Sequence, residues 1–360
     1  MKGLKIVDRY LVLEFLKPFL YSLAALVIVM LSGYLFQLTD FIIIREVPLQ
    51  LVARLLSYRL PPIIVQSIAI AVLLATILSL GRLVKDNELS ALQMGGISFI
   101  RLIYPLLVLA IVASSIIYGL NERVVPQANT NYQRIVKEEI YQDQESGVYT
   151  DLLFRGGEEQ YFYAGEVDDQ EQQLKWVMIY QQGEEKRIIT AKAGSFTEDS
   201  WLLEEGLISE LDADDYLVKE EVFKGLEIEV GRDFRQFYRY DSRQPSEMNR
   251  KQLREQIDLF TEAGIDTNQL VVEYHFKLAE AILPLIFVLV GAPLSVGSEK
   301  GRLFGIIASI IIIFIYFAVV SIFRSLGGNG VVEPFLAVWF PNLLVGGVGV
   351  YLLLRENYFS

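Results

Sequence analysis

Six stretches of this chain carry almost no charged side chains, and each is long enough to cross a lipid bilayer as a helix. A bilayer core about 30 Å thick requires roughly 20 apolar residues in helical form. The stretches that meet this requirement are residues 19–38, 60–80, 102–120, 278–296, 303–323 and 335–354. The sequence therefore predicts an α-helical membrane protein with six transmembrane helices.

Charge is concentrated between the third and fourth of these stretches. Residues 121–270 contain 33 of the 44 acidic side chains but only 17 of the 32 basic ones. A membrane protein with one large insert outside the bilayer distributes its charge in this way. The net charge of −12 also argues against nucleic acid as a partner, because such binding is driven by clustered lysine and arginine.

Basic residues flank the spans unevenly, and this predicts the orientation of the chain. The short loops that share a side with the insert hold four, namely Arg45, Arg54, Arg59 and Arg324. Ten adjoin the opposite ends of the spans: Lys2, Lys5, Arg9, Lys17, Arg82, Lys85, Arg101, Lys300, Arg302 and Arg355. Because cytoplasmic loops are rich in lysine and arginine, we expect cytoplasmic termini and an insert on the outer side.

The insert is predicted to be mainly β-structure. Runs rich in aromatic and β-branched residues at 161–164, 174–180, 187–193, 201–208, 217–223 and 226–230 are separated by turn residues. Such spacing is typical of a sandwich, jellyroll or barrel. Composition does not distinguish an ordinary half-buried sheet from one whose inner face holds an apolar ligand. The predicted domains are residues 1–120, 121–245, an amphipathic connector helix capped at Ser246 over 246–270, and 271–360.

Two residue counts limit the chemistry. The chain has no cysteine and one histidine, His275, so disulfides, thiolate catalysis and cysteine-based metal sites are excluded. An intramembrane serine hydrolase would have to pair His275 with Ser295 or Ser321, and no Gly-x-Ser-x-Gly elbow is present. No Gly-x-x-x-x-Gly-Lys-Ser/Thr run exists either. We expect a non-catalytic chain without a cofactor.

The loop between the second and third spans predicts a short cytoplasmic helix. Asp86 or Asn87 can cap it, Glu88 suits its first turn, and Gly95-Gly96 ends it. One face then gathers Leu89, Leu92 and Gln93. Such a helix is placed to dock into another protein, and a capped loop helix without a partner is the equal alternative.

Several motifs resemble those of the LptF/LptG permease family of lipopolysaccharide exporters. They occur in both membrane halves and in the family's order. These motifs are Arg9-Tyr10-Leu11 with Glu14-Phe15-Leu16, residues 81–98, residues 121–129, Leu283-Pro284, Ala292-Pro293-Leu294, Gly301-Arg302, and Pro334 with residues 337–342.

The resemblance implies an architecture and a set of partners. It implies an inner-membrane protein with a periplasmic β-jellyroll inserted between the third and fourth helices. Two permeases, identical or related, would pair with a cytoplasmic ABC ATPase dimer that binds ATP and magnesium. They would extract lipopolysaccharide, or a related glycolipid, and pass it to a periplasmic jellyroll bridge protein. A membrane-anchored sensor or scaffold whose exported domain binds a periplasmic partner has the same topology and is the alternative.

The resemblance also assigns candidate site residues. The helix at about 86–95 matches the family's coupling helix, in which Glu88 would contact the ATPase. Its neighbours in that contact would be Asp86, Leu89, Leu92 and Gln93. Some family members carry lysines near the outer end of the first span that meet lipid phosphates. Here that region has none, and the candidates by position are Arg45, Arg54 and Arg59, since guanidinium pairs bidentately with phosphate. Ordinary loop arginines solvated at the membrane interface are the alternative.

Overall fold

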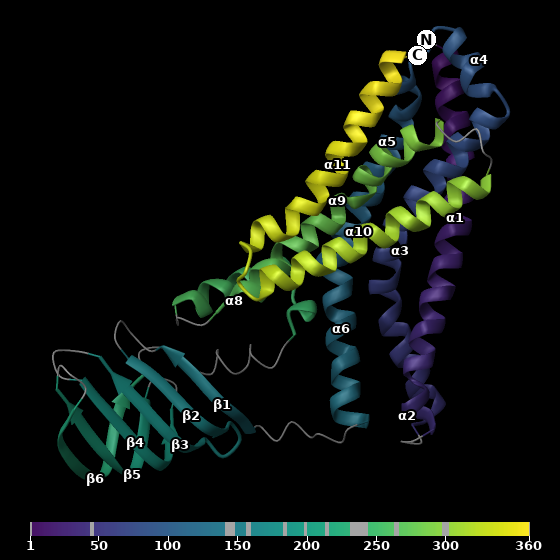
Figure 1. Ribbon diagram of the computed structural model, residues 1–360. Coiled ribbons are helices and arrows are strands. Elements are labelled where there is room, and N and C mark those ends of the chain that lie inside the picture. The colour runs from purple at the N-terminus through teal and green to yellow at the C-terminus, as the bar shows by residue number, and fades with distance from the viewer. Residues whose placement is uncertain are drawn as a thin grey trace. The chain divides into compact units, whose positions relative to one another are not determined.

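The structure, a computed structural model, describes residues 2–43, 47–140, 148–155, 160–182, 186–197, 200–212, 216–230, 244–262, 266–296 and 302–359. The chain divides into two compact units, one formed by Met1–Tyr132 with Asn268–Ser360 and one by Gln133–Thr267. Figure 1 shows the first as a helical bundle and the second as a sheet with a helix. The predicted fold class is confirmed, because the described residues include six helices apolar and long enough to cross a membrane, with a β-domain between the third and fourth.

The six spans lie within helices longer than the predicted apolar stretches. These helices are α1 (Lys2–Gln37), α3 (Leu49–Lys85), α5 (Phe99–Gly119), α9 (Asn268–Val296), α10 (Arg302–Gly328) and α11 (Pro334–Phe359). Two short helices accompany them, α2 (Thr39–Ile43) and α4 (Glu88–Met94). At 1.5 Å per residue, the 37 residues of α3 extend over about 55 Å, well beyond a bilayer core of about 30 Å.

Helices α3 and α9 form the centre of the membrane unit. Leu73 and Ala75 of α3 and Phe287 of α9 have no exposed surface. In α1, by contrast, none of the most apolar window is buried, and the buried share for α10 is 17%. Both termini lie at the same end of this unit, close to α4 (Figure 1).

The helix that begins with α5 continues past the predicted end of the third span at residue 120. A π-helical turn, η1 (Leu120–Val124), is followed by α6 (Val125–Arg134) and by η2 (Ile135–Ile140). Within η1, the buried Asn121 donates from Nδ2 to Glu280 Oε2 on α9 at 2.8 Å. Because a π-turn holds an extra residue, it rotates the helix face at this point, and the rotation accompanies a satisfied buried amide.

The β-domain is one antiparallel sheet in sequential order from β1 to β6. Its strands are β1 (Val148–Arg155), β2 (Gln160–Asp168), β3 (Gln173–Gln181), β4 (Lys186–Phe196), β5 (Ser200–Leu211) and β6 (Leu217–Glu229). The sequence pattern does not predict β1, and it divides β6 in two at Lys224-Gly225. The strand runs through this glycine, which pairs with Glu204 of β5.

One face of the sheet forms a core, in which the rings of Phe162 and Trp201 meet edge to face at 5.2 Å. A row of residues that crosses all six strands is absent from the cross-strand pairs, although the register is the same on both sides of it. We call this row the crease; it consists of Asp151, Gly165, Trp176, Lys192, Glu205 and Lys224. Buried neighbours on either side of it are three residues apart instead of two, as in the pairs Ala164 and Val167, Leu174 and Val177, and Ala191 and Gly194.

Two bulky residues of the crease have left-handed backbone conformations. Trp176 has φ 56° and Glu205 has φ 42°, a region that non-glycine residues rarely adopt. In β3 and β5 this left-handed residue absorbs the extra position, so that residues on both sides keep facing the core. Strict alternation of apolar and polar residues is therefore lost at this row.

A helix follows the sheet after a short 3₁₀ turn, η3 (Pro245–Glu247). In α8 (Arg250–Glu262), Leu253 and Phe260 are buried and Ile257 is half-buried, as the helical spacing predicts. The predicted cap at Ser246 is wrong, because Ser246 lies within the 3₁₀ turn. Asn249 and Gln252 instead form a reciprocal capping box, with two hydrogen bonds of 2.9 Å.

Candidate functional site

The short helix α4 is ended by its two glycines. The amide of Gly96 donates to Gln93 O at 2.8 Å, and that of Ile97 donates to Leu92 O at 3.2 Å. With Gly96 at φ 84°, these bonds define a Schellman motif, which requires a residue that tolerates the left-handed conformation. The predicted termination of the helix at Gly95-Gly96 is thus confirmed.

The start of α4 differs from the prediction. Asn87 occupies the N-cap position, but its backbone is left-handed and its side chain makes no capping hydrogen bond. Asp86 does not cap the helix either, because its carboxylate accepts a hydrogen bond from Arg82 Nε at 3.3 Å. The start of α4 is therefore held by contacts with neighbouring elements rather than by a local cap.

A cluster of polar side chains joins α4 to α1 and α3. We call it the Arg82 cluster, and it consists of Tyr10, Glu14, Arg82 and Glu88. Arg82 donates from Nη1 to Glu14 Oε1 at 2.5 Å and from Nη2 to Tyr10 Oη at 2.9 Å. Tyr10 Oη in turn donates to Glu88 Oε2 at 2.5 Å, and Arg82 Nη2 lies 3.4 Å from Glu88 Oε1. These bonds are charge-assisted and therefore stronger than bonds between neutral groups.

The predicted docking face of α4 points into its own chain. Leu89 is 2% exposed and belongs to the membrane core, against which Leu92 also packs. The assignment of Leu89 to a partner contact is therefore corrected, because the apolar face of this helix is used to anchor it. Gln93 is half-buried, whereas Asp86, Ser90, Ala91 and Met94 are exposed, Met94 by 84%.

Two of the three candidate arginines lie among the described residues, and Arg45 lies outside them. Arg54 is exposed on α3. Arg59, five positions further along the same helix, lies between two tyrosines, with its guanidinium carbon 5.1 Å from the ring centroid of Tyr34 and 4.0 Å from that of Tyr132. Among the residues that the structure describes, its buried Nε has no hydrogen-bond acceptor. The two rings hold the guanidinium plane and leave donor capacity for an anion.

An apolar cavity of about 480 Å³ lies in the membrane unit. Its walls come from α1, α3 and α10, the last of which is mostly unburied. The residues that line it are Leu26, Ile70, Leu74, Ile310, Ile313, Phe314, Phe317 and Ala318. A cavity with this lining accepts hydrocarbon rather than a charged solute.

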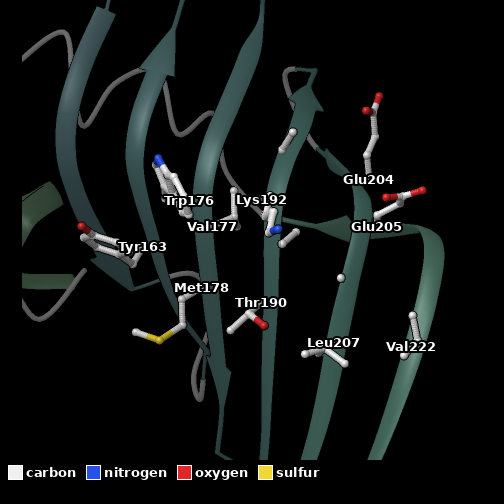
Figure 2. Close-up of a pocket in the computed structure, with 13 residues that line it drawn as sticks. Tyr163, Trp176, Val177, Met178, Thr190, Lys192, Glu204, Glu205, Leu207 and Val222 are labelled. Carbon is white, nitrogen blue, oxygen red and sulfur yellow. The ribbon is translucent and has the colours of Figure 1, made fainter.

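A second cavity, of about 670 Å³, lies on the face of the sheet opposite the core. Figure 2 shows its floor as a row of side chains across neighbouring strands. The row consists of Tyr163, Met178, Thr190, Leu207 and Val222, which are successive cross-strand partners. Trp176 of the crease, 65% exposed, stands beside this row. We call this cavity the sheet groove.

Charges border the sheet groove at the crease. Lys192, Glu204 and Glu205 contribute to its lining (Figure 2). Next to the crease, Lys175 Nζ donates to Glu166 Oε1 at 2.6 Å, and this hydrogen bond raises the pKa of the Lys175 ammonium. The lysine therefore stays charged at neutral pH, and its pair links β2 and β3 next to the crease.

His275 takes part in ring packing at the start of α9. Its ring lies edge to face with those of Tyr274 and Phe335, at centroid distances of 5.2 and 5.3 Å. His275 therefore packs against aromatic rings near the end of this span. The same is true of Arg324, whose guanidinium pairs with Glu273 at 2.7 Å and covers the ring of Phe276 at 3.8 Å.

Six spans, a short anchored helix between the second and third, and an antiparallel sheet inserted after the third define a multi-pass membrane protein with one large extramembrane domain. The model of the family "Lipopolysaccharide export system permease LptF/LptG" matches residues 9–355. The chain therefore belongs to the LptF/LptG family of transport permeases. It is 20% identical over 361 residues to the lipopolysaccharide export system permease protein LptF of Escherichia coli K12, covering 98% of this chain and 95% of that protein. The LptF protein of Shigella flexneri matches to the same extent.

Proposed function

We propose that this chain is a permease subunit of an ATP-driven exporter that extracts lipopolysaccharide from the inner membrane. The observation that carries this proposal is the family relation over residues 9–355, which includes both membrane halves and the inserted sheet. In the proposed complex, ATP and magnesium bind to a separate cytoplasmic ABC ATPase dimer. A second permease, identical or related, completes the membrane channel.

In this proposal, the termini and α4 lie on the cytoplasmic side and the β-domain lies in the periplasm. The excess of basic residues at the ends of the spans nearest the termini supports this orientation. The ATPase would then contact the exposed face of α4, formed by Asp86, Ser90, Ala91 and Met94, with the partly exposed Glu88 at its edge.

Lipid extraction has a large free-energy cost, because each acyl methylene moved from hydrocarbon into water costs about 0.8 kcal/mol. We propose that two apolar sites reduce this cost. The cavity between α1, α3 and α10 would hold part of an acyl chain in the membrane, and the sheet groove would accept chains after extraction. From there the lipid would pass to a periplasmic jellyroll bridge.

Arg59 is the proposed contact to lipid phosphate. It supplies a positive charge held by Tyr34 and Tyr132, and its Nε has no acceptor within the described ranges of the chain. Arg54 is a second candidate, since it is exposed five positions earlier on the same helix. Neither residue pairs with a carboxylate in the part of the chain that the structure describes.

The docking proposal is tested by charge introduction on the exposed face of α4. We expect Met94→Arg to abolish co-purification of the ATPase and lipopolysaccharide export, because Met94 lies outside the Arg82 cluster and its substitution leaves the internal contacts intact. Glu88→Arg should have the same effect. The matched control is Asp258→Arg on the exposed face of α8, which changes the net charge as Glu88→Arg does. Normal export and normal ATPase co-purification with Met94→Arg would contradict the docking assignment.

A further inference from the structure

The Arg82 cluster joins two elements that the chain itself does not connect directly. Helix α4 is continuous with α3 through residues 86–87 and with α5 through residues 95–98. Its connection to α1 is made by side chains, since Tyr10 and Glu88 are 78 positions apart. We infer that the hydrogen-bonded cluster of Tyr10, Glu14, Arg82 and Glu88 transmits movement of α4 to α1, with Arg82 as the positioning residue.

Arg82 is suited to this role because its guanidinium meets three partners at once. Nη1 binds the carboxylate of Glu14 on α1, and Nη2 is shared between Tyr10 on α1 and Glu88 on α4. A planar group with fixed donors constrains the relative position of its acceptors, which a flexible lysine ammonium does not. A displacement of Glu88 therefore displaces the start of α1.

The burial of α1 is uneven along its length, so that movement at the Arg82 cluster is expected to move the whole helix. Leu11 and Phe15, which flank the cluster residues, are 2% exposed and hold this end of α1 against the core. Beyond them, Tyr21, Ile28 and Phe36 are 76%, 64% and 82% exposed. The helix is thus fixed at the cluster and largely unburied over the rest of its length, so that a small rotation at the cluster moves its far end.

A second ion pair allows a matched comparison. Arg101 Nη2 on α5 lies 2.8 Å from Asp8 Oδ2 on α1, and this pair does not include α4. Loss of Arg101 removes a guanidinium contact to α1 of similar exposure while it leaves the α4 contact in place. Arg82→Ala removes the guanidinium that bridges Glu14 and Glu88 and leaves the direct hydrogen bond from Tyr10 to Glu88. Tyr10→Phe removes that direct bond, by a single hydroxyl, and leaves the guanidinium in place.

This inference rests on the proposed function. Distances between pairs of spin labels test the inference and the proposed function separately. The chain has no cysteine, so Leu13→Cys on α1 and Leu354→Cys on α11, both exposed, are the only labelled positions of this chain. In the purified complex with its ATPase, trapping with ATP and vanadate should shift the distance between these labels. We expect the shift to persist in Arg101→Ala, to fall by at least half in Arg82→Ala and in Tyr10→Phe, and to be absent when these two substitutions are combined, while the ATPase still co-elutes. An unchanged shift in Arg82→Ala would overturn the inference.

A distance measurement on the chain without the ATPase separates the inference about the Arg82 cluster from the proposed function. Labels at Leu13→Cys and Ser90→Cys report the position of α4 relative to α1 without the ATPase. The distance distribution should become at least twice as broad in Arg82→Ala, and an unchanged width would overturn the link between the two helices. Failure of any ATPase to co-elute with the unsubstituted chain would contradict the proposed function, independently of this width.

Discussion

The close approach of α11 to α9 at Gly349 provides a quantitative test of the membrane fold. A Cβ at this position would lie 2.8 Å from Val290 Cγ2, 2.9 Å from the carbonyl carbon of Leu289 and 3.0 Å from the backbone nitrogen of Val290. Two of these atoms belong to the α9 backbone, so side-chain rotation cannot relieve the contact. Gly349→Ala must therefore separate the two helices, whose packing depends on small residues at the interface.

The expected cost follows from overpacking and can be isolated with a control. Overpacking a well-packed interface costs about 1–3 kcal/mol, whereas replacing glycine by alanine within a helix favours folding by about 1 kcal/mol. A Cβ added to Gly347, on the same helix, would meet nothing within 4 Å. The difference between Gly349→Ala and Gly347→Ala therefore cancels the propensity gain and leaves the contact cost.

Thermal unfolding of the two variants in detergent measures this difference. At about 2–4 °C per kcal/mol for a unit of this size, Gly349→Ala should melt roughly 2–12 °C below Gly347→Ala. Equal melting temperatures would refute the close packing of α9 and α11.

Three further substitutions have defined outcomes. Gly206→Ala would place a methyl group against the carbonyl oxygen and aromatic ring of its neighbouring strands, so limited proteolysis should show a sheet less stable by about 1–3 kcal/mol, whereas Gly225→Ala has open space and should match the unsubstituted chain. Leu89→Ala removes a buried side chain at a cost of about 2–5 kcal/mol and should raise hydrogen exchange in α4, with the exposed Met94→Ala as the unaffected comparison. Arg59→Ala should reduce the lipopolysaccharide that co-purifies with the chain, and the same reduction with dephosphorylated lipid would argue against a phosphate contact.

The number of membrane helices is predictable because hydropathy and length decide it. The ends of the helices are less so, and the third is the clearest case. Polar residues such as Asn121 continue the helix for 20 residues beyond residue 120 through η1, α6 and η2. Helical backbone outside the bilayer carries no hydropathy signal, and Asn121 is stabilised by Glu280, which is 159 positions away.

Most strands of the insert can be predicted from the sequence, but the crease cannot. The sequence around Trp176 shows only imperfect alternation, and a left-handed tryptophan has no recognisable local pattern because this conformation favours glycine and asparagine. Gly225 has the local pattern of a strand break, although cross-strand pairing carries β6 through it. Pairing with a neighbouring strand overrides such local preferences.

The position of the candidate site is predictable, but its internal contacts are not. The sequence places Glu88 on a short helix, and the structure confirms that helix, yet its partners Tyr10 and Arg82 lie on other elements. Periodicity defines which face a residue occupies and does not define which helices meet. The burial of Leu89 has the same origin, since the apolar face of a surface helix packs first against its own chain.

Each of the six strands contributes one residue to the crease, and the strands pair in register on both sides of it. Every strand must therefore keep its crease residue if both parts of the sheet are to pair. If one strand lost its crease residue, its neighbours would each be one position too long at that row, and one half of the pairing would slip. If Trp176 instead adopted an ordinary extended backbone, the side chains in the remainder of its strand would point to the opposite faces of the sheet. An insertion or deletion at the crease of one strand would therefore require the same change in the other strands. The surface that forms the sheet groove can then change only as a whole.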